Sequence, residues 1–266
     1  MVTTTRTPDD RLPSFAVVVP AFNEEGGIEA SVLAIDQALA ELPNDTILIV
    51  VDDGSVDGTV RKLEELAERM PKLVVIFREA NGGYGAALRT GTVAAASSAR
   101  DYVLFMDSDL TNDPAYISVF AEHMSEGADV IKATRYAGGG GVHGVPMRRR
   151  LPSLAGNLLA RKLFGLPLSD CTNGFRAVRT DLLSSVELGE PAFAVIMEEL
   201  YRLRPIARTY AEVPNVLTTR AVHLRPTAFD YGPRALWRYL RYPLLAARDR
   251  LLGRQSGSVE SASAGR

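Results

Sequence analysis

Two aspartates, Asp107 and Asp109, stand one residue apart directly after an apolar segment, Tyr102–Met106. A run of consecutive apolar residues is typical of a parallel strand that is covered on both faces. Open α/β sheets bind their ligands at the carboxyl ends of such strands. Two carboxylates at that point suit Mg²⁺ or Mn²⁺, which takes oxygen ligands and leaves room for substrate phosphates. The alternative is an acidic turn in which an aspartate caps the next helix.

Polar residues also follow the two segments that we expect to form the first strands, Phe15–Pro20 and Thr46–Val51. The first leads into Pro20–Glu24, and the second leads into Asp52–Ser55. Because the loops after parallel strands meet at one edge of a sheet, we expect the ligand site at this edge. There Asp53 suits hydrogen bonds from a base or a ribose. Its alternative role is to cap a helix or close a turn.

Three glycines lie in the segment Asn81–Gly85, between an expected strand and an expected helix. The segment lacks the spacing of known phosphate-binding loops, and no such spacing follows the first strand either. We interpret these glycines as backbone that leaves space near a ligand, and a plain strand-to-helix turn is the alternative.

Expected strands and helices alternate along the first half of the chain, which predicts an α/β fold with a mainly parallel sheet and helices on both faces. The expected strands are Phe15–Pro20, Thr46–Val51, Leu73–Phe77, Tyr102–Met106 and Asp129–Thr134, and the expected helices are Glu29–Leu42, Val60–Met70, Ala86–Ser97 and Pro114–Glu126. After Arg135 the alternation stops at a glycine run, Gly138–Gly141. Beyond it we expect helices at Leu151–Leu163, Met197–Leu203 and Ala235–Leu252, the last interrupted by Pro243, and a strand at Tyr210–Leu217.

Length, charge and cysteine content narrow the class of protein. The 266 residues, 46% of them hydrophobic, suit one large α/β domain with an extension, and the net charge of −2 argues against nucleic acid as a partner. The one cysteine, Cys171, excludes an intrachain disulfide and favours a reducing compartment such as the cytoplasm. We expect no signal peptide, because Met1–Pro13 lacks an apolar core, and no transmembrane helix, because no apolar run approaches about 18 residues.

A series of short motifs, in order and with suitable gaps, is more specific than any one of them. The motifs are Val19–Glu24, Val51–Ser55 with Asp57–Thr59, Asn81–Gly85, Met106–Pro114, Thr134–Tyr136, Arg149 with Ser153 and Asn157, Asp170–Arg176, and Glu212–Pro214. Over roughly residues 15–225 the chain resembles the family-2 glycosyltransferases of the GT-A fold. Within that family it is most similar to the dolichol-phosphate or polyprenol-phosphate mannose synthase group.

The resemblance implies a role for each of several residues around a nucleotide sugar. The subsite for base and ribose would consist of Pro20, Phe22, Glu24, Val51 and Asp53. Asp107 and Asp109 would hold Mg²⁺ or Mn²⁺ against the donor diphosphate, with Ser108 beside them, and Arg135 would join them in catalysis.

The resemblance also implies contacts to phosphate, because the planar fork of arginine binds phosphate oxygens in pairs. Arg135, Arg220 and Arg225 would contact the donor diphosphate. Arg149 and Ser153 would contact the acceptor phosphate. For Arg149, a solvated basic loop is the alternative.

The resemblance implies an inverting transfer of a sugar from a nucleotide sugar to a polyprenyl or dolichyl phosphate. The expected sugar is mannose, and the expected donor is GDP-mannose. The cation and the arginines would offset the charge on the leaving diphosphate. A phosphate acceptor is already anionic and attacks unaided, whereas a hydroxyl acceptor needs a general base. The acidic candidates are Asp170, Glu198 and Glu199, and none is assigned as a base, because Asp170 is expected to order its own loop and the others to lie on a helix face.

The C-terminal region mixes aromatic and basic residues: Trp237, Tyr239 and Tyr242 lie among Arg234, Arg238, Arg241, Arg248 and Arg250. This composition suits peripheral contact with an anionic membrane, where a polyprenyl-phosphate acceptor would lie. The alternative is a terminal helix docked on the domain or on a second copy, so a homo-oligomer stays open. We divide the chain into a disordered N-terminus (1–13), a GT-A domain (14–230), an amphipathic helical segment (231–254) and a disordered tail (255–266).

Three departures from the resembled group lie where donor and acceptor would be recognised. Phe22 stands where the group has tyrosine, and Thr111 where it often has glutamine. Arg220–Arg225 differs from the group's Arg-x-x-Gly-x-Ser-Lys, with Arg225 as a replacement for the lysine and His223 unexpected. Two other functions therefore stay open. One is transfer to a hydroxyl of a saccharide or natural-product scaffold. The other is sugar-nucleotide binding without catalysis, against which the aspartate pair and the arginines argue.

Overall fold

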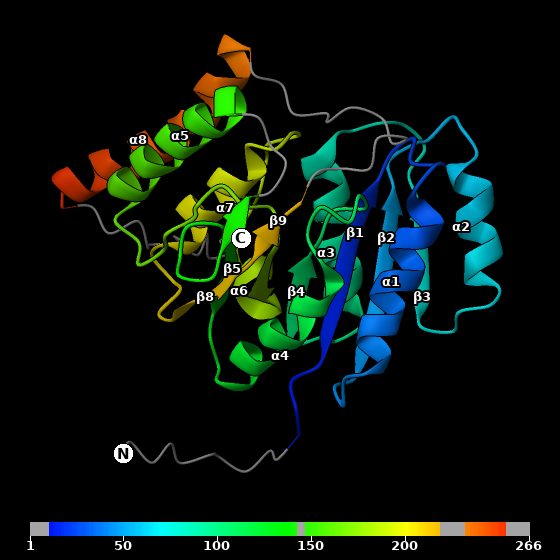
Figure 1. Cartoon of the computed structure of the whole chain (residues 1–266). Helices are drawn as coiled ribbons and strands as arrows, with labels where there is room; N and C mark the ends of the chain where they lie inside the picture. Colours follow the sequence, from blue (N-terminus) through cyan, green and yellow to red (C-terminus); the bar gives the residue numbers. More distant parts are fainter. Residues whose placement is uncertain (1–10, 143–146, 219–231, 254–266) are drawn as a thin grey trace, which may run out of the picture.

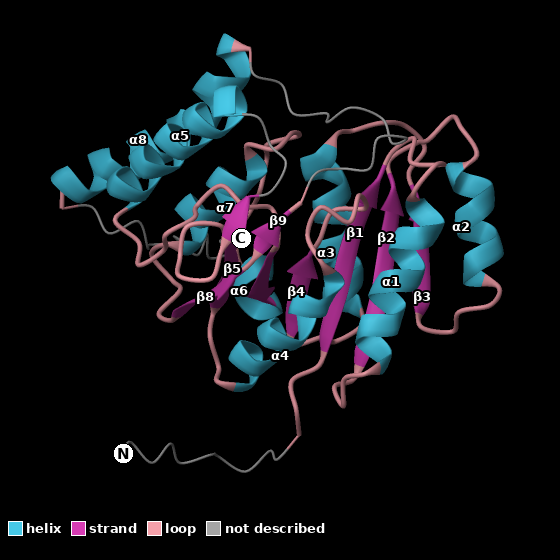
Figure 2. Ribbon diagram, viewed as in Figure 1, coloured by secondary structure: helices cyan, strands magenta, loops and turns pink. Residues whose placement is uncertain are grey.

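A seven-stranded sheet with helices against both faces forms the centre of the molecule (Figures 1 and 2). The computed structural model describes residues 11–142, 147–218 and 232–253, in the last two ranges without the side chains of residues 147–153 and 233. The strand order is β3-β2-β1-β4-β7-β5-β8. All strands run parallel except β7, which is antiparallel to both of its neighbours. The expected fold class, a mainly parallel sheet between helical layers, is confirmed.

The strands of this sheet are β1 (Phe15–Ala21), β2 (Thr46–Asp52), β3 (Leu73–Phe77), β4 (Tyr102–Phe105), β5 (Val130–Thr134), β7 (Arg176–Arg179) and β8 (Tyr210–Pro214). A separate pair joins β6 (Gly141–Val142) to β9 (Val216–Leu217). The helices are α1 (Ile28–Ala40), α2 (Thr59–Ala67), α3 (Tyr84–Ser97), the 3₁₀ helix η1 (Pro114–Tyr116), α4 (Ile117–Ser125), α5 (Met147–Phe164), α6 (Thr180–Ser184), α7 (Val195–Leu203) and α8 (Pro233–Leu251).

Two hydrophobic cores lie on opposite faces of the sheet, because successive residues of a strand point to opposite sides. In β1, Val17 and Val19 belong to the core that α1, α2 and α4 cover, whereas Val18 belongs to the core under α3, α6 and α7. The apolar runs of the sequence therefore predict strands that are buried on both faces, and they are. At Gly91 of α3 an added Cβ would lie 2.3 Å from Cγ1 of Val18, so this helix packs directly on β1.

Helices α5 and α8 lie side by side at the end of the sheet that carries β5 and β8 (Figure 2). α8 also packs on α7. Its Tyr242 hydroxyl donates to Glu190 at 3.0 Å, and Asp249 accepts from Tyr201 at 2.8 Å. One face of α8 is thus docked on the domain.

Several features differ from the elements expected from the sequence. The single strand expected at Tyr210–Leu217 is divided into β8, in the main sheet, and β9, in the separate pair. The short strand β7 lies inside the sheet, between β4 and β5, within a stretch that mixes turn residues with a short apolar segment. Pro243 lies inside a continuous α8 and does not interrupt it. Among the described residues, no helix is both long enough and apolar enough to cross a membrane. The expected disordered ends, at 1–13 and 255–266, lie largely outside the described residues.

Candidate functional site

The carboxyl ends of β1, β2 and β4 lie next to one another at one edge of the sheet. Beyond β2, the N–H of Asp53 donates to the carbonyl of Ala21 at 2.8 Å. Beyond β4, the N–H of Met106 donates to the carbonyl of Val18 at 3.1 Å. The three polar loops that follow these strands therefore begin side by side, where ligands of parallel sheets bind.

The loop after β4 fixes the orientation of Asp109. The Oδ1 atom of Asp109 accepts hydrogen bonds from the backbone N–H of Thr111 at 3.1 Å and from its hydroxyl at 2.8 Å. Leu110 between them has a φ of 54°, the left-handed region that a tight turn requires. The hydroxyl of Ser31 donates to the carbonyl of the buried Ser108 and ties the loop to α1. Thr111 thus orients the carboxylate before it.

The residues present fit a divalent cation that is shared with a substrate. Asp107 and Asp109 are both partly exposed at the strand end, and they offer the hard oxygen ligands that Mg²⁺ and Mn²⁺ prefer. Within the described ranges, no group of three or more His, Cys, Asp or Glu side chains is arranged to hold a metal ion. Two carboxylates plus diphosphate oxygens are a common arrangement for Mg²⁺. The helix-capping role belongs to Asp113, whose Oδ1 accepts from the N–H of Ala115 at 2.9 Å.

Asp53 binds the glycine loop of its own chain. Its two carboxylate oxygens accept from the N–H groups of Gly82 at 3.1 Å and Gly83 at 2.7 Å, and Oδ1 forms an ion pair with Nε of Arg78 at 2.7 Å. An added Cβ on Gly83 would lie 2.5 Å from the carbonyl oxygen of Pro191. The close approach that this glycine permits is therefore to the protein's own backbone. The expected contact of Asp53 with a ribose or base stays a prediction.

The other residues expected around the nucleotide differ in how much of their side chains is exposed to solvent. The side chain of Val51 is fully buried in the core, so any contact to a nucleotide there would come from its backbone. Glu24 is 4% exposed, and its N–H donates a hydrogen bond to the hydroxyl oxygen of Thr59 at 2.8 Å. Pro20 and Phe22 are partly exposed at the strand end. These two are the members of the group with side-chain surface for a base or sugar.

Arg135 is held in a fork by Asp170. Its Nε and Nη2 donate to the two carboxylate oxygens at 2.7 and 3.0 Å, and Nη2 also donates to the hydroxyl of Thr172 at 2.6 Å. Burial acts to raise the pKa of Asp170, but the charge and hydrogen bonds of Arg135 outweigh it and hold that pKa below its usual value. Nη1 takes no part in these bonds, and the expected contact of Arg135 with a phosphate stays a prediction.

Each acidic side chain considered as a general base has a structural partner. Asp170 pairs with Arg135 as described. Oε2 of Glu198 accepts from the N–H groups of Gly189 at 2.8 Å and Glu190 at 2.7 Å. Glu199 is fully buried and binds Arg176 through both oxygens at 2.6 Å. A carboxylate that is buried in such bonds gives up stabilising contacts when it takes a proton, so all three fit positioning better than proton transfer.

Two buried cations, Lys132 and Arg176, were not singled out from the sequence. They face each other across β5 and β7, and both are fully buried. Nζ of Lys132 donates to the carbonyl of Asn173 at 2.8 Å. Burial and the neighbouring Arg176 lower the pKa of Lys132 to about 8. For Lys132, the signal in the sequence is a charged residue inside an otherwise mainly apolar strand, because such residues are rarely buried without a partner.

Several expected phosphate contacts fall outside the description. Arg149 and Ser153 belong to α5, but their side chains are not described. Arg220, His223 and Arg225 lie outside the described residues. Their roles stay predictions.

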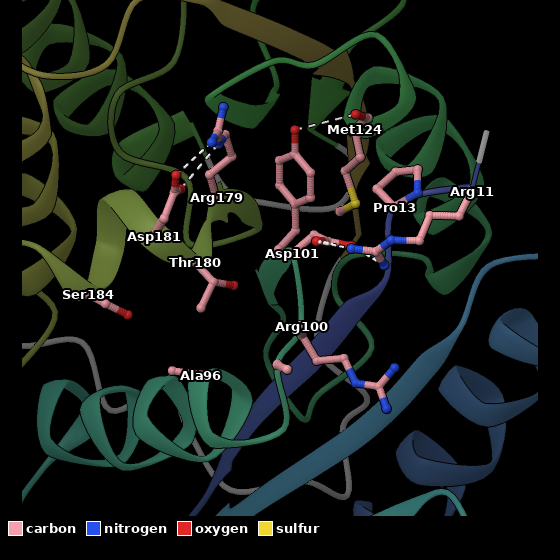
Figure 3. Close-up of a pocket in the computed structure, with 12 residues that line it drawn as sticks. Arg11, Pro13, Ala96, Arg100, Asp101, Met124, Arg179, Thr180, Asp181 and Ser184 are labelled. Carbon is pink, nitrogen blue, oxygen red and sulfur yellow. Dashed lines mark hydrogen bonds and ion pairs between the residues drawn. The ribbon is translucent and has the colours of Figure 1, made fainter. Parts of the chain in front are cut away.

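A cavity of about 540 Å³ lies at the opposite edge of the sheet, near the amino end of β4 (Figure 3). Most of its charged lining is paired within the cavity: Arg11 binds Asp101 at 2.9 and 3.0 Å, and Arg179 binds Asp181 through two bonds. Arg100 pairs with Asp45, outside the lining. The cavity is lined by Arg11, Pro13, Ala96, Ala99, Arg100, Asp101, Tyr102, Met124, Arg179, Thr180, Asp181 and Ser184. It contains none of the residues expected to bind the donor.

A mainly parallel sheet whose strand ends carry an Asp-x-Asp loop, a third aspartate and a fixed arginine is typical of the GT-A type of nucleotide-sugar transferase. The model of the family described as Glycosyl transferase family 2 matches residues 16–186, and the chain belongs to this family.

Curated relatives carry names from one branch of the family. The chain is 31% identical over 231 residues to the dolichol-phosphate mannosyltransferase of Pyrococcus furiosus, a match that covers 85% of this chain and 62% of that protein. It is 27% identical over 241 residues to the polyprenol monophosphomannose synthase of Mycolicibacterium smegmatis, with 89% of each chain covered. The chain thus spans less than two thirds of the Pyrococcus protein and most of the mycobacterial one.

Solved structures of similar fold include glucosyl-3-phosphoglycerate synthase from Mycobacterium tuberculosis. Its complex with Mg²⁺ and uridine diphosphate gives a TM-score of 0.62 at 26% identity, over 89% of this chain and 80% of that one. Its complex with Mn²⁺ and UDP-glucose gives 0.63 at 25% identity, over 89% and 79%. These neighbours bind a nucleotide together with a divalent cation.

Proposed function

We propose that this protein transfers a sugar, with inversion, from a nucleoside-diphosphate sugar to a polyprenyl phosphate. The observation that carries the proposal is the engagement of Asp170, Glu198 and Glu199 in structural bonds. A hydroxyl acceptor needs a base, whereas a phosphate acceptor is anionic at neutral pH and needs none. The names of the two curated relatives support the same acceptor.

The reaction follows from the positions of the charged groups. An oxygen of the acceptor phosphate attacks the anomeric carbon, the bond from that carbon to the donor diphosphate breaks, and its electron pair leaves on the diphosphate. Asp107 and Asp109 hold a Mg²⁺ or Mn²⁺ ion, which when bound offsets the charge on the leaving diphosphate. Arg135, fixed by Asp170, adds a second positive charge that needs no reorganisation during the reaction.

Donor recognition is assigned to the loops after β1 and β2. We assign stacking or edge contacts with the nucleotide to Pro20 and Phe22, and hydrogen bonds with its base or ribose to Glu24 and Asp53. The mannose in the relatives' names supports GDP-mannose as the donor, whereas the neighbours' UDP supports a uridine nucleotide. GDP-mannose is the donor we propose, and a panel of donors tests it.

Acceptor recognition and membrane contact are assigned to α5, α8 and the segment between β9 and α8. In this proposal Arg149 and Ser153 bind the acceptor phosphate, and Arg220 and Arg225 bind the donor diphosphate. The face of α8 opposite its docked side supports peripheral attachment, since it alternates arginine with large apolar residues at helical spacing. This exposed stripe consists of Arg234, Trp237, Arg241, Leu244, Arg248 and Leu251.

An anionic membrane suits this stripe better than water does. Trp237 is 62% exposed and Leu251 is 87% exposed, although both are large and apolar. Helices that lie in a membrane interface combine such residues with arginines, which bind anionic lipid head groups. We place the protein on the cytoplasmic side of a membrane that contains polyprenyl phosphate. The alternative is that a second copy of the chain covers this face of α8.

Transfer of radiolabelled sugar into an organic-extractable fraction tests the proposal. The assay combines Mn²⁺ or Mg²⁺, a short polyprenyl phosphate and a panel of nucleotide sugars, with Asp109→Asn as the control. We expect metal-dependent label in the lipid phase that is lost in the variant. Metal-dependent release of nucleoside diphosphate with water-soluble acceptors, and no lipid label, would instead assign a hydroxyl acceptor.

A further inference from the structure

A residue on a different loop, Tyr84, fixes the carboxylate of Asp107, the first residue of the aspartate pair. Tyr84 is the first residue of α3, in the glycine loop that Asp53 holds. Its hydroxyl is hydrogen-bonded to the carboxylate of Asp107. Because an ionised carboxylate only accepts, the hydroxyl donates the proton in this bond. Asp109 is fixed from within its own loop by Thr111, whereas Asp107 is fixed by Tyr84 from across the site.

The tyrosine itself is held by three contacts. Its ring stacks on Phe193 with 4.4 Å between centroids and an interplanar angle of 21°. Its hydroxyl also receives a hydrogen bond from the guanidinium of Arg176. A Cβ added at Gly174 would lie 3.1 Å from the Tyr84 hydroxyl and 3.6 Å from Oδ2 of Asp107. Gly174 therefore lies directly beside both groups.

Behind Tyr84, Arg176 is rigid as well. It lies opposite Phe105 in the β4–β7 register, with its guanidinium 4.3 Å from the centroid of that ring. Glu199 accepts two hydrogen bonds from it at 2.6 Å, and the carbonyl of Gly174 accepts a third at 2.8 Å. A continuous chain of bonds therefore runs from the buried Glu199 through Arg176 and Tyr84 to Asp107.

We propose that Tyr84 is a positioning residue for the cation that Asp107 binds. The hydrogen bond from its hydroxyl restricts the orientation of the Asp107 carboxylate. Hydrogen-bonded partners of this kind orient metal ligands, and their loss typically lowers metal affinity 10- to 100-fold. The inference rests on the proposed function, because it requires that Asp107 be a cation ligand.

The test is a titration of Mn²⁺, followed by electron paramagnetic resonance, with and without GDP. The variant Tyr84→Phe removes the hydroxyl and keeps the ring that stacks on Phe193. We expect the Kd for Mn²⁺ to rise about tenfold. In steady state, the Mn²⁺ concentration for half-maximal activity rises by the same factor, while kcat at saturating Mn²⁺ stays within about threefold.

The matched control is Tyr102→Phe. Tyr102 lies at the other end of β4, where its buried hydroxyl donates to the carbonyl of Met124 at 3.3 Å. This control also loses one buried tyrosine hydroxyl, and we expect it to leave the Kd for Mn²⁺ unchanged. Thermal unfolding of both variants shows whether either has lost its fold.

Three results are distinguishable. A raised Kd in Tyr84→Phe alone, with an unchanged Tm, supports the positioning role. An unchanged Kd in Tyr84→Phe, where Asp107→Asn abolishes binding, overturns that role and leaves the metal site intact. Mn²⁺ binding that survives in Asp107→Asn overturns both the positioning role and the proposed cation site.

Discussion

The variant Glu198→Gln tests whether the carboxylate of Glu198 has a structural role or acts as a general base in catalysis. Glu198 is 3% exposed, and its Oε2 accepts two backbone hydrogen bonds at 2.8 and 2.7 Å. A glutamine oxygen can accept the same two bonds, but they become neutral and weaken by about 1 kcal/mol each. The ion pair with the half-exposed Arg202, at 3.8 Å, adds less than about 1 kcal/mol. We therefore expect a loss of about 2 kcal/mol of unfolding free energy, or about 4–8 °C in Tm.

The assay measures kcat with polyprenyl phosphate at saturating donor, together with thermal unfolding. Since Glu198 moves no proton in the proposed reaction, we expect kcat to stay within about threefold of wild type. Glu122→Gln, at an exposed carboxylate on α4, is the control that should change neither quantity. A fall in kcat of about 10²- to 10⁴-fold with an unchanged Tm is the signature of a lost general base, and it would refute the reasoning.

Three further predictions concern the buried core and the outer helix. Burial raises the pKa of Cys171 to about 12, so a thiol reagent at pH 8 should modify it only after unfolding, and rapid native modification would contradict this. Burial lowers the pKa of Lys132 from 10.5 to about 8, so the unfolded state binds more protons between these values. Unfolding free energy should therefore rise with pH from about 8 to 10, and denaturant titrations of Lys132→Met should lack that part of the rise. In flotation with anionic vesicles, Trp237→Ser combined with Leu244→Ser should weaken binding at least about tenfold, since each buried large apolar side chain contributes about 1.5–3 kcal/mol. The control Val93→Ser, 66% exposed on α3, should bind like wild type.

The first half of the fold follows from local patterns. Each strand up to β5 is a mainly apolar run, most of them rich in valine and isoleucine, and its position therefore needs no knowledge of its partners. Parallel strands then bring their polar loops to one edge, which predicts the neighbourhood of Asp53 and Asp107.

The remaining features depend on contacts between distant residues. β7 reads Arg-Ala-Val-Arg, and its first arginine is buried only because Glu199, 23 positions later, binds it. A buried charge with a distant partner gives no apolar periodicity, so the strand is not recognisable from its own residues. In the same way, the sequence alone does not show that the Asp53 carboxylate accepts hydrogen bonds from the N–H groups of Gly82 and Gly83.

The central position of β7 has a consequence for the order of folding. β1 to β4 can pair as soon as they are synthesised, but β5 bonds to β7 and β8, which follow it by more than 40 residues. Until residue 179 has left the ribosome, β4 is an open edge strand, and such edges invite pairing with other chains. β7 also carries Arg176, the residue behind Tyr84. A nascent or truncated chain that ends before it would hold every residue of the aspartate loop and lack the strand that braces it.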